Sequence, residues 1–430
     1  MFKIKKYISI ELFIVFFWAL MDLIEVLVIL NTHIFTGDFF PWEVTVSNTT
    51  IILLFLSQLL IYLSVYKFYI LFIKEKRLIK SNLNLNIHLY KFIDYFFLLL
   101  LLLNILFFIM GASNVAGSYK PNSISFVLHL ISIDAIFPIY YFLNRNRNNK
   151  IIYITNILIY FLFQIAKGWS GIILQIFLFE LYFRSRQKIS YKFLLLLPLL
   201  FVGGIFLYQF VFPMKLAIRA HGSILDIKPI SFVTAAGLLT GRLSMMGNLI
   251  AIFQYKSDIL NLLNNFYPLN FEILKFIRIQ IPSFIASNLF SYNIFRYGMV
   301  GSALWLFKTG QLPMRGVIEV SGDGPTLLGT SYLLFLRNPL ELILFYLFTF
   351  FVIFYIKIIL DTFKSKDIYF PFFISLIYFV HEAGEVAAFG VLFSSLTTFF
   401  AVILFAKAIL YILKNKSQIN KVYDKKTEAF

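Results

Sequence analysis

Long apolar runs separated by short polar segments make up most of the chain. Most of the runs approach the roughly 20 residues that an α-helix needs to cross the hydrocarbon core of a bilayer. Apolar and polar residues do not alternate along them, as they would in the strands of a transmembrane β-barrel. The pattern predicts an all-α polytopic membrane protein with about 10 transmembrane helices. The predicted spans lie at about 8–30, 51–73, 91–111, 124–143, 151–166, 169–183, 193–212, 339–360, 368–388 and 389–412.

Composition excludes several classes of protein. Hydrophobic residues make up 60% of the 430 residues and charged residues only 14%, whereas about 25% of the residues in soluble domains are charged. The chain contains no cysteine. We therefore exclude a soluble globular enzyme, a disulfide-linked scaffold, a cysteine nucleophile and a zinc or iron–sulfur site that depends on cysteine.

The placement of charge predicts the topology. The net charge is +17, and in a membrane protein Lys and Arg gather on the cytoplasmic side. Basic clusters precede the first span, follow alternate spans and close the chain. This alternation predicts that both termini are cytoplasmic, and it accounts for the charge without a nucleic acid partner. The first span carries Asp22 and Glu25 and lacks a small-residue cleavage site, so we do not expect it to be a cleavable signal.

The run 151–183 is long enough for one very long helix or for two short ones. A single helix would place the basic cluster between Arg184 and Lys192 on the outer side, against the positive-inside rule. We therefore predict a hairpin that turns at the Lys-Gly-Trp-Ser-Gly segment 167–171. Its arms are short for a bilayer, so we expect them to lie among other helices.

Residues 213–338, between the seventh and eighth spans, interrupt the pattern. By parity this large loop lies outside the cytoplasm, in the periplasm of an organism with two membranes. It has eleven basic and five acidic residues, a net charge of +6, yet 231–253 and 281–307 are rich in Phe, Leu and Ile. We predict amphipathic helices on the membrane surface or partly folded into the bundle, within a single domain of residues 1–430.

Three arginines of this loop are candidate ligands of an anion at the outer membrane surface. Arg219 follows the seventh span, Arg242 lies among small residues, and Arg315 precedes the Gly-rich segment 322–330. Guanidinium groups are always charged and bind phosphate through two parallel hydrogen bonds, which suits a pyrophosphate. Lys167, at the hairpin tip, is a further candidate cation. The alternative is that these residues face anionic lipid headgroups.

His381 and Glu382 are candidates for acid–base chemistry. By parity they lie at the outer end of the ninth span, where ionisable groups tend to face a polar cavity. Beside a bound pyrophosphate, either could take a proton from a sugar hydroxyl. If the segment is helical, His381 and Glu385 share a face. It is not a His-Glu-x-x-His zinc motif, because position 385 is Glu. A solvated turn between two helices is the alternative.

Asp22, Glu25 and Asp134 are acidic residues within the predicted spans. Asp22 and Glu25 are three residues apart, about one turn of a helix. Such residues act either as hydrogen-bonding partners between helices or as a proton path. The sequence leaves both readings open.

These features resemble the O-antigen polymerase (Wzy) family, membrane enzymes that polymerise oligosaccharide repeat units. The resemblance covers most of the chain, since it includes about ten spans and one large periplasmic loop late in the sequence. Three segments carry it. They are the hairpin tip at 167–171, where Lys167 replaces the usual arginine, Gly-Arg-Leu-Ser at 241–244, and Pro-Thr-Leu-Leu-Gly at 325–329.

The resemblance implies a fold similar to the GT-C glycosyltransferases and a metal-independent, cofactor-free reaction at the periplasmic face of the bacterial inner membrane. The growing glycan on undecaprenyl pyrophosphate would move onto the non-reducing end of a new lipid-linked repeat unit. The three loop arginines and Lys167 would bind the pyrophosphate, and His381 or Glu382 would be the base. Implied partners are lipid-linked glycans, the lipid bilayer, a chain-length regulator protein and a flippase.

Two other functions fit the same features. An O-antigen ligase shares the architecture and the donor but transfers the glycan to lipid A–core. A flippase for the lipid-linked unit is the other alternative, although transporters commonly show internal repeats and charges near the midplane of the membrane. The chain shows no repeat, and its outer basic residues are concentrated in one loop, which favours the enzyme.

Overall fold

The computed structural model describes residues 7–36, 39, 41–78, 87–110, 132–145, 150–168, 171–185, 188–190, 197–219, 228–266, 299–310, 324–363, 365–384 and 387–427. Nearly all regular structure in this part is helical. The elements are β1 Tyr7–Ser9, α1 Ile10–Thr32, α2 Asn48–Phe68, the π-helix η2 Tyr69–Lys74, α3 Ile87–Ile109, α5 Ile133–Asn144, α6 Ile151–Ala166, α7 Gly171–Arg184, β2 Lys188–Ser190, α8 Leu197–Arg219, α9 Phe232–Leu243, α10 Met246–Gln254, α11 Lys256–Phe266, α14 Met299–Thr309, α15 Thr326–Arg337, α16 Pro339–Asp361, α17 Tyr369–Tyr378, the π-helix η4 Phe379–Ala383 and α18 Ala387–Thr427.

Five helices of the described part are long and apolar enough to cross a membrane. They are α1, the continuous helix α2–η2, α3, α16 and residues 392–412 of α18. The number becomes six if α9 and α10, which meet at a bend of 66°, form one broken span. The helices support the predicted class, an all-α multi-pass membrane protein. The total of ten spans stays a prediction.

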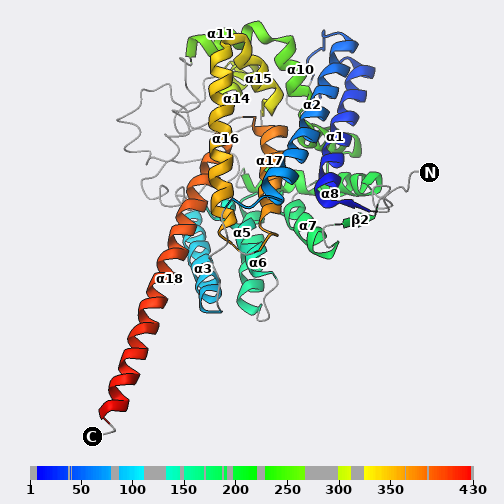
Figure 1. The fold of residues 1–430 in the computed structure, drawn as a ribbon. Helices are drawn as coiled ribbons and strands as arrows, with labels where there is room; N and C mark the ends of the chain where they lie inside the picture. Colours follow the sequence, from blue (N-terminus) through cyan, green and yellow to red (C-terminus); the bar gives the residue numbers. More distant parts are fainter. Residues whose placement is uncertain are drawn as a thin grey trace, which may run out of the picture.

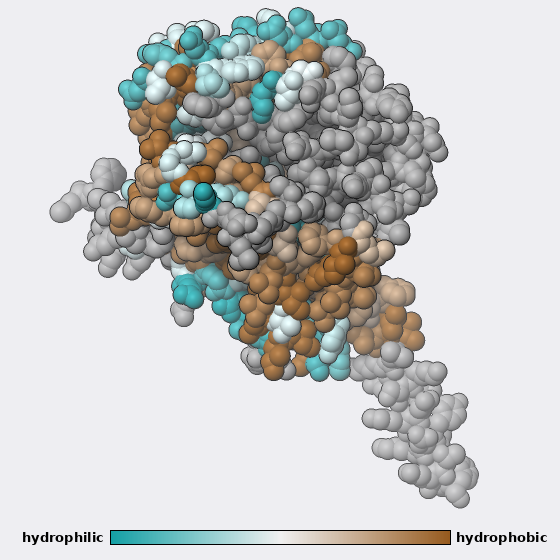
Figure 2. Space-filling model, turned by 180° about the vertical axis from the view of Figure 1, so that it is seen from behind, coloured by the Kyte–Doolittle hydropathy of each residue, from teal (hydrophilic) through white to brown (hydrophobic). Residues whose placement is uncertain are grey.

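The outer surfaces of these helices are apolar. Leu53 and Leu60 of α2 are 57% and 64% exposed, and Leu347 of α16 is 62% exposed. Hydrophobic residues also cover much of the middle and lower parts of the face in Figure 2, and hydrophilic residues gather at the upper end and at the lower edge. Large apolar patches of this kind mark interaction surfaces, and on helices of spanning length they fit contact with lipid chains.

Local capping signals fix where the long helices begin. The side chain of Ser9 accepts a hydrogen bond from the backbone N–H of Leu12, and Ser47 caps α2 in the same way. Asn338 caps α16, whose first residue is Pro339. Serine and asparagine are favoured at this position because the first N–H groups of a helix have no partner within it, and proline is favoured next because its own N–H is missing.

The helices form two groups, and α18 contacts both. In the first group, α1 packs along α2, α17 packs against both, and α15 packs against α16 and η4. In the second, α3 packs against α5 and α6, in the lower half of Figure 1. Helix α18 contacts α16 in one group and α3 and α5 in the other, and then continues towards the C-terminus (Figure 1).

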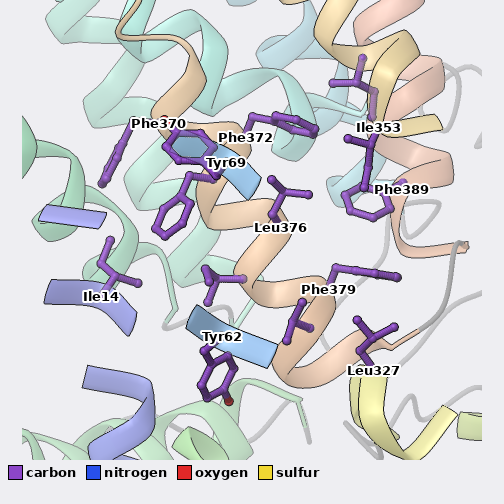
Figure 3. Close-up of a cluster of buried hydrophobic side chains, with 14 of the residues drawn as sticks. Ile14, Tyr62, Tyr69, Leu327, Ile353, Phe370, Phe372, Leu376, Phe379 and Phe389 are labelled. Carbon is purple, nitrogen blue, oxygen red and sulfur yellow. The ribbon is translucent and has the colours of Figure 1, made fainter. Parts of the chain in front are cut away.

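An apolar core holds α17 among its neighbours. Phe370, Phe372 and Leu376 of α17 are at most 2% exposed and lie beside Tyr69 of η2 (Figure 3). Tyr62 of α2 lies at the edge of this cluster, and its hydroxyl oxygen points away from the apolar side chains (Figure 3). Burial of such large side chains fixes the position of η4, which directly follows α17.

Contacts at one end of the bundle join segments that the charge pattern places on one side of the membrane. Strand β1 pairs antiparallel with β2. Lys74 Nζ lies 2.6 Å from Glu11 Oε1, and the Tyr182 hydroxyl donates to Asp367 Oδ1 at 2.9 Å. All of these segments belong to predicted cytoplasmic connections or to the ends of spans beside them. Which face of the membrane they occupy stays a prediction.

The structure confirms that the run 151–183 is divided into two helices, as the hairpin prediction requires. Helix α6 ends at Ala166, Gly168 has a positive φ of 77°, and α7 begins at Gly171. Helices α6 and α7 contact one another. The pairing of β2, which follows α7, with β1 also agrees with a chain that returns to the side where it started.

Two boundaries differ from the predicted ones. Helix α8 continues through Pro213 to Arg219 instead of ending at the proline. The run 368–388 is interrupted, because η4 ends at Ala383 and Gly384 adopts a left-handed conformation with φ of 57°. The condition under which His381 and Glu385 would share a helix face is therefore not met, and Glu385 itself lies outside the described residues.

The large loop is partly folded into the bundle, which is one of the two predicted forms. Every residue from Met246 to Ile252 of α10 is buried, and α10 packs against α1, α2 and α15. Gln254 at its end bonds the backbone of Thr45 and of Glu43, in the connection between α1 and α2. Two connections that are both predicted to lie outside the cytoplasm are thereby joined.

Candidate functional site

Five polar residues from four parts of the chain meet inside the first helix group. They are Asp22 and Glu25 of α1, Tyr62 of α2, Ser244 between α9 and α10, and His381 of η4, and none is more than 2% exposed. We refer to these five as the buried polar cluster. Ionisable groups at such positions are costly in a membrane protein and mark functional sites.

The break between α9 and α10 positions one side of the cluster. Ser244 is extended, with φ of −127° and ψ of 145°, and the helix resumes at Met246 after a bend of 66°. The bend frees backbone groups, and the N–H of Gly247 donates to Glu25 Oε2 at 3.1 Å. A Cβ at Gly247 would lie 3.0 Å from Glu25 Oε1 and 3.2 Å from the Thr36 carbonyl, so glycine permits this close approach.

The two carboxylates are joined through Ser244. Its hydroxyl oxygen lies 2.8 Å from Asp22 Oδ1 and 2.5 Å from Glu25 Oε2. The other oxygen of Glu25 is bonded by the Thr36 hydroxyl. The other oxygen of Asp22 accepts from the Tyr62 hydroxyl at 2.8 Å. Every carboxylate oxygen in the cluster is therefore in hydrogen-bond contact.

His381 forms the far side of the cluster. Its Nδ1 lies 2.5 Å from the Tyr62 hydroxyl and 4.0 Å from Asp22 Oδ1. The indole of Trp18 lies against the imidazole with ring centroids 4.3 Å apart and an interplanar angle of 32°. The backbone of Leu243 lies beside the same ring. Among the described residues, no atom lies in hydrogen-bonding position to the buried Nε2.

The local fold of η4 explains the placement of His381. A π-helix adds one residue to a helical turn and is frequent at functional sites. The Gly384 N–H bonds the Phe379 carbonyl at 2.7 Å and closes this wider turn. The sequence after α17 thus turns the imidazole towards α1 and α2, where Trp18 and Tyr62 contact it.

The start of α15 closes the site on the side of η4. Asn248 donates to the Gly324 carbonyl at 3.1 Å. A Cβ at Gly324 would lie 2.2 Å from the Glu382 carbonyl oxygen, and one at Gly384 would lie 2.2 Å from the carbonyl oxygen of Thr326. These two glycines allow the backbones of α15 and η4 to touch. Gly324, in the Gly-rich segment before α15, therefore permits the backbones of α15 and η4 to approach closely.

The structure brings some of the predicted site residues together. His381 belongs to the buried polar cluster, and Glu382 follows it, half-buried, against Gly324. Arg242 is the last residue but one of α9, beside Leu243, and its side chain is outside the described part.

Of the other predicted ligands, only the side chain of Lys167 is described, and it does not belong to the cluster. The last residue of α8 is Arg219, whose side chain is not described, and Arg315 lies outside the described residues. Lys167 is described. It is 5% exposed, and its Nζ lies 3.2 Å from Asp134 Oδ2. This pairing supports the reading of Asp134 as a hydrogen-bonding partner between helices.

Sequence reasoning missed Tyr62 and Ser244. Tyr62 is one of 25 tyrosines and has no distinguishing neighbours. Ser244 does have a signal, because it belongs to the Gly-Arg-Leu-Ser segment that drew attention to Arg242. The spacing of Asp22 and Glu25 places both on one side of α1 but does not reveal which groups they meet.

Within the described part of the chain, no group of three or more His, Cys, Asp or Glu side chains is arranged to hold a metal ion. No family model, curated protein or solved structure matches the chain.

Proposed function

We propose that the chain is a membrane glycan polymerase. It transfers a growing glycan from undecaprenyl pyrophosphate onto the non-reducing end of a lipid-linked repeat unit, at the periplasmic face of the bacterial inner membrane. In this proposal it is a metal-independent glycosyltransferase of about ten spans, similar in fold to the GT-C enzymes, with both termini in the cytoplasm. Lipid-linked glycans are its substrates, and a chain-length regulator and a flippase are partners.

One observation supports the proposal: at the break between α9 and α10, the residue that directly follows Arg242 lies with its backbone beside the imidazole of His381. Arg242 and His381 are 139 positions apart in the sequence and differ in chemistry, one a permanent cation and the other a potential base. Leu243, which directly follows Arg242, has its backbone beside the His381 imidazole. Ser244, the next residue, bonds the acids of the cluster that contains His381. A cation and a base are both needed where a sugar leaves a pyrophosphate.

The proposed roles follow from the charge changes of glycosyl transfer. Negative charge develops on the departing pyrophosphate, and a preorganised guanidinium stabilises it. The acceptor hydroxyl loses a proton, which a base within hydrogen-bond reach accepts. Arg242 takes the first role and His381 the second, with Glu382 as the alternative base. Arg219 and Arg315 complete the proposed set of pyrophosphate ligands, whereas Lys167, which pairs with Asp134, is left out of it.

The test is the length of the glycan in cells that carry Arg242→Ala, beside a gene deletion, with protein amounts checked by blotting. The proposal predicts loss of the polymer ladder in both, leaving a single repeat unit on the core. Loss in Arg242→Lys as well would show that two parallel hydrogen bonds are needed. Arg184→Ala is the matched control, because that side chain is 82% exposed, and it should keep the ladder.

Other outcomes would contradict the proposal. Loss of all glycan from the core, with lipid-linked polymer accumulating, would identify a ligase. An unchanged ladder in Arg242→Ala, with the deletion defective, would remove Arg242 from the site.

A second candidate, a flippase for the same lipid-linked unit, is favoured by one specific observation. A discontinuous helix beside buried carboxylates is typical of secondary transporters, in which freed backbone groups help to form the substrate site. The bend at Ser244 beside Asp22 and Glu25 has this form. Single repeat units trapped at the cytoplasmic face of deletion cells would support the flippase and contradict the polymerase.

A further inference from the structure

We propose that His381, Tyr62 and Asp22 form a proton relay, in which Asp22 is the final acceptor of the proton that the acceptor hydroxyl loses. This inference rests on the proposed function and deepens it. The relay is continuous, since Tyr62 lies 2.5 Å from His381 Nδ1 and 2.8 Å from Asp22 Oδ2. Tyr62 and Asp22 are positioning residues that act through His381.

The hydrogen atoms available at Ser244 show how the two acids are protonated before the reaction begins. Its hydroxyl has one hydrogen, but its oxygen contacts both Asp22 Oδ1 and Glu25 Oε2 and also accepts from the N–H of Met246. A hydroxyl donates once, so one of the two carboxyl groups must itself carry a proton and donate to Ser244. In the proposed relay Glu25 carries this proton, so that Ser244 donates to Asp22, which is a carboxylate able to accept the relayed proton.

The same counting at Tyr62 assigns the tautomer of His381. The single hydroxyl hydrogen of Tyr62 is donated to the Asp22 carboxylate. The contact with Nδ1 then requires Nδ1 to carry the hydrogen and donate to the Tyr62 oxygen. The lone pair of the neutral imidazole is therefore on Nε2, which is buried. Trp18 holds the plane of the ring.

Each proton in the relay moves by one position. The O–H bond of the acceptor breaks and an N–H bond forms at His381 Nε2, while the hydroxyl oxygen uses its electron pair to form the glycosidic bond as the pyrophosphate leaves. The hydrogen on Nδ1 passes to the Tyr62 oxygen, and the Tyr62 hydrogen passes to Asp22 Oδ2. Imidazole and phenol end neutral, and Asp22 ends as a carboxylic acid. The relay thus avoids an imidazolium at a buried position, where an isolated charge is costly.

The experiment measures polymerisation by the full-length protein in proteoliposomes, with the lipid-linked repeat unit as substrate. Tyr62→Phe removes the central hydroxyl and keeps the ring. Because positioned acid–base groups contribute about 100-fold or more, we expect kcat to fall about 100-fold with KM within about twofold. Tyr66→Phe is the matched control one turn along α2, where the hydroxyl bonds only Ser9 among the contacts described; it should keep wild-type kcat.

A second measurement needs no variant. In mixtures of light and heavy water, a relay with several protons in flight predicts a curved dependence of kcat on deuterium fraction for the wild type, and the curvature should be lost in Tyr62→Phe. A straight line for the wild type, or wild-type kcat in Tyr62→Phe, would overturn the relay alone. A wild-type protein that does not polymerise would overturn the proposed function, so the two failures are distinguishable.

Discussion

Two buried polar groups in this molecule differ in how their charges are balanced. At the end of α16, Asp361 is bonded through both oxygens to Lys357 Nζ, at 2.8 and 2.9 Å, and it also bonds Tyr369 and the N–H of Leu78. In the buried polar cluster, two acids meet a hydroxyl, a phenol and an imidazole, and within the described residues no Lys or Arg pairs with them. Both groups are almost fully buried.

The difference separates a structural group from a candidate functional one. In the Lys357–Asp361 pair, opposite charges four residues apart on one helix neutralise each other, and the neighbouring donors complete the hydrogen bonds. In the buried polar cluster, one imidazole nitrogen has no hydrogen-bond partner among the described residues, and two acids share one serine. Burial alone therefore does not indicate function. What distinguishes the buried polar cluster is that two acids share one serine beside an imidazole, with no bonded Lys or Arg among the described side chains.

Breaking the structural pair should have the largest effect. Asp361→Asn leaves the buried Lys357 ammonium without a counter-charge, and removing one partner of a buried pair costs about 3–5 kcal/mol. We expect a large loss of folded protein, measured by thermal unfolding in detergent. Wild-type stability in Asp361→Asn would contradict the structural role of the pair.

Asp22→Asn should separate activity from stability. The amide keeps the shape of the side chain but cannot accept the relayed proton, so we expect polymerisation to fall about 100-fold. Because the variant removes a buried charge, stability should be unchanged or higher. The two readouts are kcat in proteoliposomes and the unfolding temperature. An equal loss of both would place Asp22 with Asp361 as a structural residue.

Gly384→Ala should disturb the contact between α15 and η4. The left-handed conformation costs a residue with a Cβ about 1–2 kcal/mol, and the added carbon would lie 2.2 Å from the Thr326 carbonyl oxygen. We expect lower stability together with lower activity, because η4 carries His381. Gly171→Ala is the control, since its Cβ would have no atom within 4 Å. It should match the wild type in thermal unfolding.

Trp18→Leu should have the smallest effect. Aromatic contacts contribute about 0.5–1.5 kcal/mol, which corresponds to a rate change of roughly 2- to 10-fold. We expect kcat to fall within this range, because the imidazole loses the ring that fixes its plane. Phe16→Leu, at a position that is 42% exposed, should leave kcat unchanged. A complete loss of activity in Trp18→Leu would assign the indole a direct role with substrate.

The sequence predicts the long helices well because their signals are local. The apolar run at 8–30 and the cap at Ser9 together specify α1. The break at 167–171 was predictable because glycine and charge interrupt an otherwise apolar stretch. The ends of α8 and α17 were harder to predict, since Pro213 is accommodated within a helix and the π-turn of η4 has no known sequence signal here.

The site was predictable only in parts. His381 and Arg242 have recognisable chemistry and neighbours, and Asp22 and Glu25 have a recognisable spacing. Only the tertiary structure determines which groups surround these residues, because their surroundings depend on the bend at Ser244 and on the packing of α17 against α1 and α2. No local pattern encodes the contact between Tyr62 and His381, which are 319 residues apart.

The most direct test of the central claim is in vitro polymerisation. Wild-type protein and His381→Gln are compared in proteoliposomes that contain the lipid-linked repeat unit as the only glycan, and the product lengths are measured. The account predicts lipid-linked products of two or more units with the wild type and none above background with His381→Gln at equal protein amounts. Wild-type protein that leaves every glycan at one unit, or His381→Gln that extends them at the wild-type rate, would contradict it.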